Sequence, residues 1–468
     1  GQSCWQLLPV GPTSYGDSPY QSFSSYAGNP YFIDLDELAL EGLLLPEEYQ
    51  GIQWGEDPER VDYGLLYQER FPVLRTAVGR LLAEKRPDYE SFCQEQAQWL
   101  PDYALFMALK NSHGGASWEQ WPDGERLREP AALEKARKEL APELDFWQGV
   151  QYLFFRQWHA LKRYANRKGI AIIGDLPIYV ANDSVDVWAD PEQFQLDENR
   201  RPTEVSGCPP DGFAPDGQLW GNHLFDWEGM KKDGYRWWIR RIAHQFQLYD
   251  TLRIDHFRGF DEYYAIPAGD ETARNGRWRP GPGVEFFQTM EKALGARDII
   301  AEDLGFLTDT VRQLLRETGY PGMKVLEFAF DSRDTGSDYL PHCYSPHCVV
   351  YAGTHDNDTI QGWIASAPEK DVEYAKEYLR LTEAEGWHWG MMRSAWASAA
   401  NLAVMQFQDL LGLGSEARMN IPSTTGENWK WRTLPGSYSK ALAKRLHHET
   451  RVYQRLAPRP VQPQPEER

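Results

Sequence analysis

The chain has 468 residues, of which 41% are hydrophobic and 25% are charged. This composition supplies enough apolar side chains for a large folded core and excludes wholesale disorder. Asp and Glu outnumber Lys and Arg by 69 to 49, giving a net charge of −20, which disfavours binding to nucleic acid or to anionic membrane surfaces. We therefore expect a folded protein that binds a neutral ligand.

The cysteines do not have the spacing of a disulfide framework, and their number is odd. No run of about 18 apolar residues is present, and the first residues lack the basic and apolar regions of a signal peptide. These features predict a cytoplasmic protein with no membrane partner. The five cysteines are Cys4, Cys93, Cys208, Cys343 and Cys348.

Short apolar, β-branched segments that end in polar residues occur along the chain, as expected for parallel barrel strands that emerge at the loop face. Helical patterns separate most of them. Residues 150–168 are an example, with Phe154, Trp158 and Leu161 on one face and Gly169 as the stop signal. The pattern predicts an α/β fold of the (β/α)8 TIM-barrel type. The sequence contains seven of the expected barrel strands, at residues 4–10, 170–180, 252–257, 299–304, 323–330, 349–354 and 402–410.

We expect residues 1–456 to form a single catalytic barrel domain. Residues 35–148 are too long for a connection, and their charged, helical pattern predicts a mostly helical insertion. Residues 189–233 are rich in Gly, Pro and Trp and predict a second, loop-rich insertion near the active site. Residues 457–468 contain four prolines and several charges, which predicts a disordered tail.

Acidic residues follow three of the expected strands. Arg253 and Asp255 are two residues apart, so both side chains lie on one face of a strand, and the neighbouring cation favours an ionised nucleophile. Glu302 follows three apolar residues, where partial burial suits a general acid. Residues 353–359 add a dense polar row. Each acid alone is compatible with a helix cap or a surface ion pair, whereas three together indicate a catalytic site.

Six segments carry a resemblance to a known family. The sequence resembles the 4-α-glucanotransferases of the amylomaltase, or disproportionating enzyme, family, which is glycoside hydrolase family 77, and the resemblance spans nearly the whole chain. The matching segments are residues 11–21, 174–180, 253–259, 301–305, 353–359 and 416–420.

The resemblance implies a retaining transfer of α-1,4-glucan segments, with starch, glycogen and maltooligosaccharides as the substrate class and no cofactor. It makes Asp255 the nucleophile, Glu302 the acid/base and Asp356 the carboxylate that holds the reacting sugar. The substrate-binding residues that it implies are Tyr15, Tyr20, Asp175, Gln218, Trp220, Arg253, His355 and Asn420.

The sequence departs from the family pattern at three places. Gly212 stands where the family usually has Tyr, and Ser423 follows Pro422 where the family often has Gly. Members of the family usually also carry a stretch with the first barrel strand before the match to Cys4. We therefore expect the first strand to be absent from this chain and the natural protein to be longer.

Other motifs indicate no metal or nucleotide site. His342 and Cys343, with His347 and Cys348, lack the usual ligand spacings and favour a plain loop. The glycines form no dinucleotide-binding motif. Two alternatives to a transferase remain at this stage, namely a related hydrolase of the α-amylase type and a non-catalytic glucan-binding protein.

Overall fold

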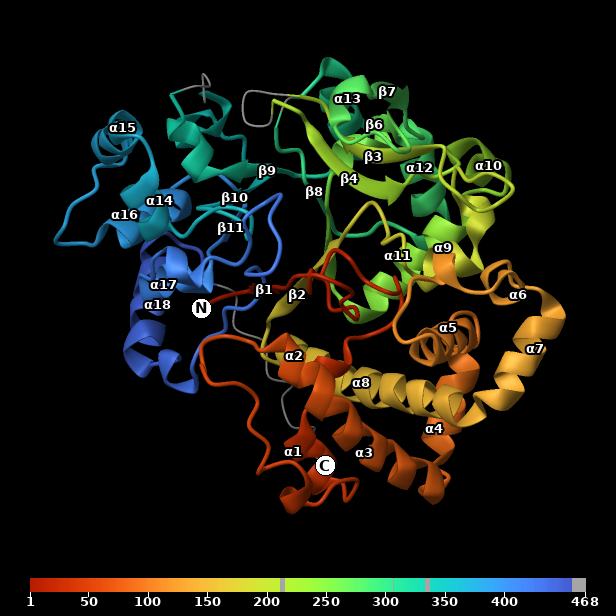
Figure 1. Ribbon diagram of the computed structural model, residues 1–468. Helices are drawn as coiled ribbons and strands as arrows, with labels where there is room; N and C mark the ends of the chain where they lie inside the picture. The colour runs from red at the N-terminus through yellow and green to blue at the C-terminus, as the bar shows by residue number, and fades with distance from the viewer. Residues whose placement is uncertain (211–214, 306, 333–336, 457–468) are drawn as a thin grey trace, which may run out of the picture.

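The computed structural model describes residues 1–210, 215–305, 307–332 and 337–456, and its centre is a set of parallel strands (Figure 1). Four of them pair in the order β1, β2, β5, β8, and three pair in the order β11, β10, β9. The first set is β1 (Cys4–Gln6), β2 (Ala171–Leu176), β5 (Thr251–Ile254) and β8 (Ile299–Ala301). The second set is β9 (Gly322–Val325), β10 (Cys348–Tyr351) and β11 (Leu402–Val404).

The two parallel sets adjoin at β8 and β9. The Ala301 amide donates to the Pro321 carbonyl at 2.9 Å, and the Met323 amide donates to Asp303 Oδ1 at 2.6 Å. The order is therefore β1, β2, β5, β8, β9, β10, β11, which is the chain order of the seven predicted strands. All seven are confirmed, and the sequential parallel order is that of a (β/α) barrel.

The predicted strands were too long at their carboxyl ends. The segment predicted at 402–410 leaves the strand at Val404, and Phe407–Leu411 forms the helix α17. The segment predicted at 323–330 likewise ends its strand at Val325 and turns into a 3₁₀ helix at Leu326–Phe330. Short apolar runs do not distinguish a strand from a buried helical turn, because both bury every side chain.

Helix α8 (Ala141–Arg167) lies beneath the strands in Figure 1 and includes the predicted helix except for Lys168, which is its C-cap. Phe154 and Trp158 are buried on it, whereas Leu161 is exposed. Gly169 follows the helix with φ of +77°, and the Ile170 amide donates back to the Ala165 carbonyl at 3.0 Å. This left-handed glycine ends the helix and turns the chain into β2.

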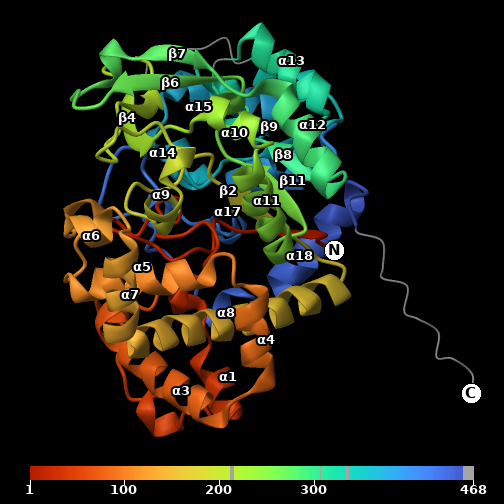
Figure 2. The same ribbon diagram turned by 90° about the vertical axis from the view of Figure 1, so that its right-hand side faces the viewer.

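Residues 35–148 are mostly helical, and these helices lie with α8 on one side of the strands (Figures 1 and 2). Helices α3 and α5 pack against α8, and the buried residues of the three helices belong to the same apolar core as β2 and β5. The helices are α1 (Leu35–Leu40), α2 (Tyr63–Leu65), α3 (Phe71–Glu84), α4 (Pro87–Glu95), α5 (Leu100–Ser112), α6 (Asp123–Arg126) and α7 (Pro130–Glu139).

Residues 189–233, which we expected to be loop-rich, contain two strands. β3 (Glu204–Cys208) and β4 (Gln218–His223) join β6 (Glu262–Pro267) and β7 (Arg277–Pro280) in an antiparallel sheet of order β4, β3, β6, β7. The sequence pattern missed them because β3 pairs with β6, a strand far along the chain. At Gly207 an added Cβ would lie 2.2 Å from the Gln218 carbonyl oxygen, so the close pairing of β3 and β4 requires glycine.

Among the remaining helices, α11 (Arg236–Leu248) packs against β2 and β5. In the part of the chain that is described, no helix is long and apolar enough to cross a membrane. The tail at 457–468 lies outside the described residues. The helices are α9 (Val185–Ala189), α10 (Trp227–Lys232), α11 (Arg236–Leu248), α12 (Gly283–Leu294), α13 (Asp309–Thr318), α14 (Ile360–Ser366), α15 (Glu369–Leu379), α16 (Trp387–Trp396) and α18 (Lys440–Val452).

Candidate active site

An arginine links two acids at the carboxyl ends of β2 and β5. Asp175 and Arg253 are partners in the register of the two strands. Arg253 Nη1 donates to Asp175 Oδ1 and Oδ2 at 2.8 and 2.7 Å and to Asp255 Oδ1 at 3.0 Å. The Asp175 side chain is fully buried, and that of Asp255 is 31% exposed. Arg253 therefore fixes the orientation of Asp255 and leaves it accessible.

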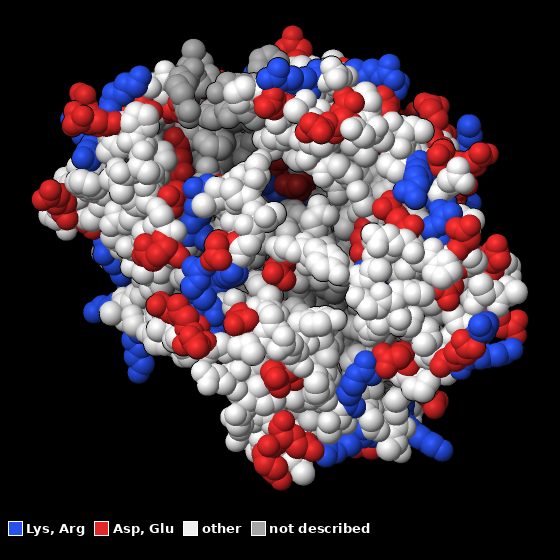
Figure 3. Space-filling model, in the orientation of Figure 1, with Lys and Arg blue, Asp and Glu red and all other residues white. Residues whose placement is uncertain are grey.

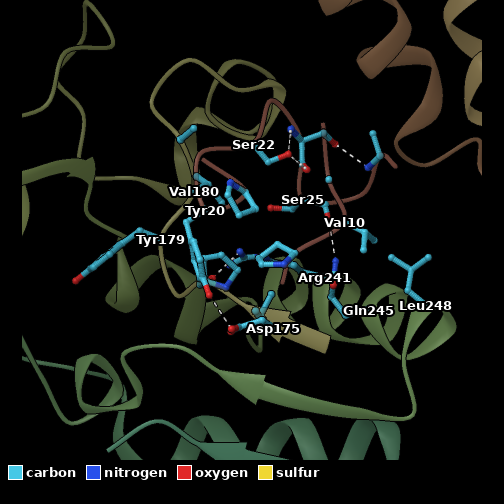
Figure 4. Close-up of a pocket in the computed structure, with 18 of the residues that line it drawn as sticks. Val10, Tyr20, Ser22, Ser25, Asp175, Tyr179, Val180, Arg241, Gln245 and Leu248 are labelled. Carbon is cyan, nitrogen blue, oxygen red and sulfur yellow. Dashed lines mark hydrogen bonds between the residues drawn. The ribbon is translucent and has the colours of Figure 1, made fainter. Parts of the chain in front are cut away.

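Tyr20 reaches the same network from the N-terminal loop. Its Oη donates to Asp175 Oδ2 at 2.8 Å, and Figure 4 shows the two side chains pointing toward one another. The Tyr20 ring stacks on His355 with centroids 5.1 Å apart and planes at 22°. Burial, with the charge of Asp175 next, raises the pKa of Tyr20 well above its usual value. Tyr20 is therefore a neutral donor that connects β2 to the loop after β10.

Figure 4 also shows the cavity that lies on the N-terminal-loop side of Asp175. It is lined by Val10, Tyr20, Asp175, Arg241 and Gln245, among others, and none of the three candidate catalytic acids lines it. It is therefore the space behind the network rather than the place of the reaction.

Glu302 follows β8 and lies next to Asp255. Its Oε2 accepts the His256 amide and its Oε1 accepts the Leu304 amide, both at 2.8 Å. His256 is the residue after Asp255, so a hydrogen bond joins the two chain segments that carry the acids. Burial raises the pKa of Glu302 to about 7, with the charge of Arg253 opposing and that of Asp255 adding to the rise. A carboxyl with a pKa near neutrality can both donate and accept a proton.

Asp356 is held by side chains from loops. Asn420 Nδ2 donates to Asp356 Oδ1 at 2.7 Å, and His355 Nε2 lies 3.4 Å from Asp356 Oδ2. The Asp356 side chain is 49% exposed. Its charge also raises the pKa of Tyr20, which places Asp356 within electrostatic reach of the Tyr20–Asp175 pair.

Two predicted residues of β4 lie beside His256, the residue after Asp255. The Trp220 ring meets His256 edge to face at 4.8 Å, and Trp220 Nε1 donates to Gln218 Oε1 at 3.0 Å. Burial lowers the pKa of His256 to about 4, so its imidazole is neutral at pH 7. Gln218 and Trp220 therefore present a polar and an aromatic surface beside His256.

Tyr15 lies apart from this network. Its side chain is 74% exposed, and its Oη donates to the Gly115 carbonyl at 3.1 Å, after helix α5. Gly212, a departure from the family pattern, lies outside the described residues.

Sequence reasoning missed Trp429. Its ring lies 5.9 Å from Tyr20 and 5.8 Å from His355, centroid to centroid. No local pattern identifies this residue, because its partners are far away in the sequence. The one available signal is its place nine residues after Asn420, in a segment with one glycine, Gly426, and several polar residues.

The His–Cys pairs do not converge on a metal. His342 Nδ1 lies 2.6 Å from Tyr378 Oη, and His347 Nε2 lies 2.8 Å from the Gly319 carbonyl oxygen. Across the described ranges, no group of His, Cys, Asp and Glu is arranged to hold a metal ion.

The face shown in Figure 3 has a hollow near its middle with acidic atoms at the bottom and uncharged residues around the rim. Such a surface suits a neutral polar ligand that reacts at carboxylates. The side chains of two acids of the described site, Asp255 and Asp356, are 31% and 49% exposed, and one arginine and several aromatic rings lie beside them.

Known proteins are similar to this chain in sequence and in fold. A family model described as 4-alpha-glucanotransferase matches residues 1–436. The 4-alpha-glucanotransferases of Clostridium butyricum and Thermus thermophilus are 47% and 48% identical to the chain, which covers 94% and 92% of them, in each case over 97% of this chain.

Two solved structures of amylomaltases are similar to this chain. The amylomaltase from Streptococcus agalactiae in complex with acarbose has a TM-score of 0.95 at 42% identity, over 97% of this chain and 92% of that one. The amylomaltase from Corynebacterium glutamicum, at 19% identity, has a TM-score of 0.73 over 96% of this chain and 70% of that one, which shows a shared fold. The chain therefore belongs to the 4-α-glucanotransferase family and is an enzyme with glucanotransferase activity.

Proposed function

We propose that the chain transfers α-1,4-glucan segments to the 4-hydroxyl of an acceptor glucan or glucose by a retaining double displacement. The observation that carries this mechanism is the hydrogen bond from the amide of His256, directly after Asp255, to the carboxylate of Glu302. It keeps a nucleophile and an acid/base on adjacent strand ends. A retaining reaction needs the two carboxyl groups about 5 to 5.5 Å apart.

In the first displacement, a carboxylate oxygen of Asp255 attacks the anomeric carbon of the donor glucan. The bond from that carbon to the glycosidic oxygen breaks, and the protonated Glu302 gives its proton to the leaving oxygen. The pKa of about 7 supports this role because much of Glu302 is then protonated at neutral pH. The products are a glucosyl–Asp255 ester and a shortened glucan.

In the second displacement, the ionised Glu302 takes the proton of an acceptor 4-hydroxyl while the oxygen of that hydroxyl attacks the anomeric carbon. The ester bond breaks, the Asp255 carboxylate is restored, and the configuration is retained after two inversions. Water can replace the acceptor, so transfer requires an acceptor that is held in line. Effective molarities of about 10⁵ to 10⁸ M are attainable for such positioning.

The binding roles follow from the contacts. Asp356, with His355 and Asn420, supplies acceptors and donors for sugar hydroxyls, and Tyr20, Asp175 and Arg253 support the reacting unit. Gln218 and Trp220 extend the contact surface beside His256. The exposed ring of Tyr15 is a platform on which a longer glucan stacks, since flat rings suit sugar faces.

The substrate class is α-1,4-glucans and maltooligosaccharides. The Streptococcus agalactiae relative is described in complex with acarbose, and the uncharged rim of the hollow (Figure 3) suits a neutral carbohydrate. We propose a cytoplasmic location, because the number of cysteines is odd and their spacing forms no disulfide framework.

A reaction with maltotriose as the only substrate tests the proposed function. The enzyme should yield glucose together with chains longer than maltotriose, while the number of reducing ends stays constant, because transfer makes one bond for each bond that it breaks. A colorimetric count of reducing ends and chromatography of the products measure both quantities in one reaction.

A hydrolase gives the opposite result. Reducing ends would rise by one for each bond cleaved, and no product would exceed three glucose units. That outcome would assign the same three acids to a hydrolase of the α-amylase type, and no cleavage at all would indicate a binding protein.

A further inference from the structure

Trp429 completes a group of three rings beside the catalytic acids. Tyr20, His355 and Trp429, which we name the aromatic cluster, have centroids 5.1 to 5.9 Å apart. Trp429 is 7% exposed. Its ring contacts Tyr20, which hydrogen-bonds Asp175, and His355, which lies beside Asp356.

Trp429 is held in an unfavourable backbone conformation. Its φ is +64°, in the left-handed region that bulky residues rarely adopt. Its amide donates to the Met419 carbonyl at 2.7 Å. Such a conformation persists only where the surroundings determine it, and it is concentrated at functional sites.

The segment that leads into helix α2 supplies much of the constraint on the Trp429 backbone. Residues 58–63 run along residues 427–432, and we name this pairing the clasp. Tyr63 Oη donates to the Trp429 carbonyl at 2.6 Å. The Val61 amide donates to the Lys430 carbonyl at 2.7 Å, and Arg60 forms an antiparallel bridge with Trp431.

The segment that carries Trp429 also carries Asn420. Asn428 Oδ1 accepts the Ile421 amide at 3.0 Å, and its Nδ2 donates to the Thr424 carbonyl at 3.0 Å, which closes the loop between the two. One stretch of chain therefore holds Asp356 through Asn420 and holds Tyr20 and His355 through Trp429.

We propose that Trp429 is a positioning residue for the transfer reaction and that the clasp fixes it in place. Its ring limits the motion of Tyr20, whose Oη donates to Asp175, and of His355, which lies against Asp356. The inference rests on the proposed function. Small misplacements of groups that orient substrate lower the rate strongly, so the effect falls on kcat more than on KM.

The test compares four single variants with the wild type by the rate of glucose release from maltotriose. Trp429→Leu should lower kcat about tenfold and change KM less than about twofold, whereas Trp429→Phe keeps a flat ring and should retain most of kcat. Tyr63→Phe, which removes one clasp hydrogen bond, should lower kcat about threefold.

Tyr344→Phe is the matched control. It also removes a hydrogen bond from a tyrosine to a main-chain carbonyl, that of Tyr339, at 2.7 Å, away from the aromatic cluster. Its loss of thermal stability should resemble that of Tyr63→Phe, and its kcat should stay at the wild-type value.

A kcat for Trp429→Leu equal to that of the wild type would overturn the inference. If Trp429→Leu does not fold, equal kcat values for Tyr63→Phe and Tyr344→Phe overturn it instead. The count of reducing ends and the product lengths test the proposed function independently of the role of Trp429. Glucose without longer chains from the wild type rejects transfer but leaves the kcat comparison intact, and no glucose at all overturns both.

Discussion

The proposed nucleophile and acid/base lie on strand ends, whereas the third acid lies on a loop. Asp255 and Glu302 each follow a barrel strand directly, and Ile254 and Ala301 are paired in the register of β5 and β8. Glu302 is fixed by two main-chain amides. Asp356 lies further from the end of β10 and depends on the side chains of Asn420 and His355.

This difference agrees with the proposed roles, in which Asp255 and Glu302 form and break bonds and Asp356 holds the sugar. Groups that form and break bonds need positions within a fraction of an ångström, which strands packed in a core provide. A group that holds a sugar must admit and release chains of different length, and loops allow this adjustment. Changes on the strand side should therefore cost more activity than changes on the loop side.

The largest effect is expected at the proposed nucleophile, Asp255. Asp255→Asn should lower kcat on maltotriose by about 10⁴-fold or more, because a neutral amide cannot attack the anomeric carbon. Circular dichroism and calorimetric titration with maltotetraose should show an intact fold and retained binding. Substantial turnover in a preparation free of wild-type enzyme would contradict the assignment.

Glu302→Gln should lower kcat by about 10³-fold on maltotriose, because the leaving oxygen then receives no proton. The loss should be smaller on a maltoside whose leaving group needs no proton. Equal losses on the two substrates would show that Glu302 is not the general acid.

The pH dependence tests the same group. Burial raises the pKa of Glu302 to about 7, and the acid must be protonated for the first displacement, so kcat/KM should fall as pH rises through about 7. The residual activity of Glu302→Gln should lack this alkaline decline. The readout is initial rates between pH 5 and 9 in buffers of constant ionic strength.

The strand side of this comparison could be predicted from the sequence. Apolar segments that end in Asp255 and Glu302 identify both the strands and the acids, because a parallel strand is buried along its length and polar where it emerges. Asp356 was found by the density of polar residues after β10. The resemblance to the family implied Asn420 only as a substrate-binding residue, and its hydrogen bond to Asp356 was not predicted.

The loop side could not be predicted, because its contacts join distant segments. Trp429 contacts Tyr20, and neither sequence neighbourhood has a periodic pattern that indicates the other. The strands β3 and β4 were missed for the same reason, since β6 completes their sheet. The division into one barrel domain with two insertions stays a prediction.

A moderate effect is expected on the loop side. Asn420→Ala removes the hydrogen bond to Asp356 Oδ1 and should lower kcat about tenfold, the loss typical of one bond to a charged group. Asn275→Ala is the control, because Asn275 Nδ2 also donates to an aspartate, Asp270, at 3.0 Å. A loss at Asn420 as large as that of Glu302→Gln would remove the distinction between the two regions.

The smallest effect concerns the buried Glu327, which lies beneath the loop that carries Asp356. Glu327 is 4% exposed, its Oε1 has no hydrogen-bond partner among the described residues, and an added Cβ at Gly353 would lie 2.9 Å from this oxygen. Burial, with the charges of Asp409 and Asp358 next, raises the pKa of Glu327 well above its usual value.

The folded state therefore keeps a proton on Glu327 that the unfolded state releases. The stability that depends on this proton is complete below the unfolded pKa, and it is lost as pH rises toward the raised folded value. Glu327→Gln has no proton to lose, so its melting temperature should decline less between pH 5 and 8 and exceed that of the wild type by about 2 °C at pH 8. Its kcat should stay within about twofold of the wild type, because the amide keeps the shape of the neutral carboxyl beneath the loop. Glu317→Gln, on the exposed face of α13, is the control and should follow the wild-type melting curve at every pH. If Glu327→Gln melts in parallel with the wild type across this range, Glu327 is ionised in the folded protein and the loop rests on a buried charge.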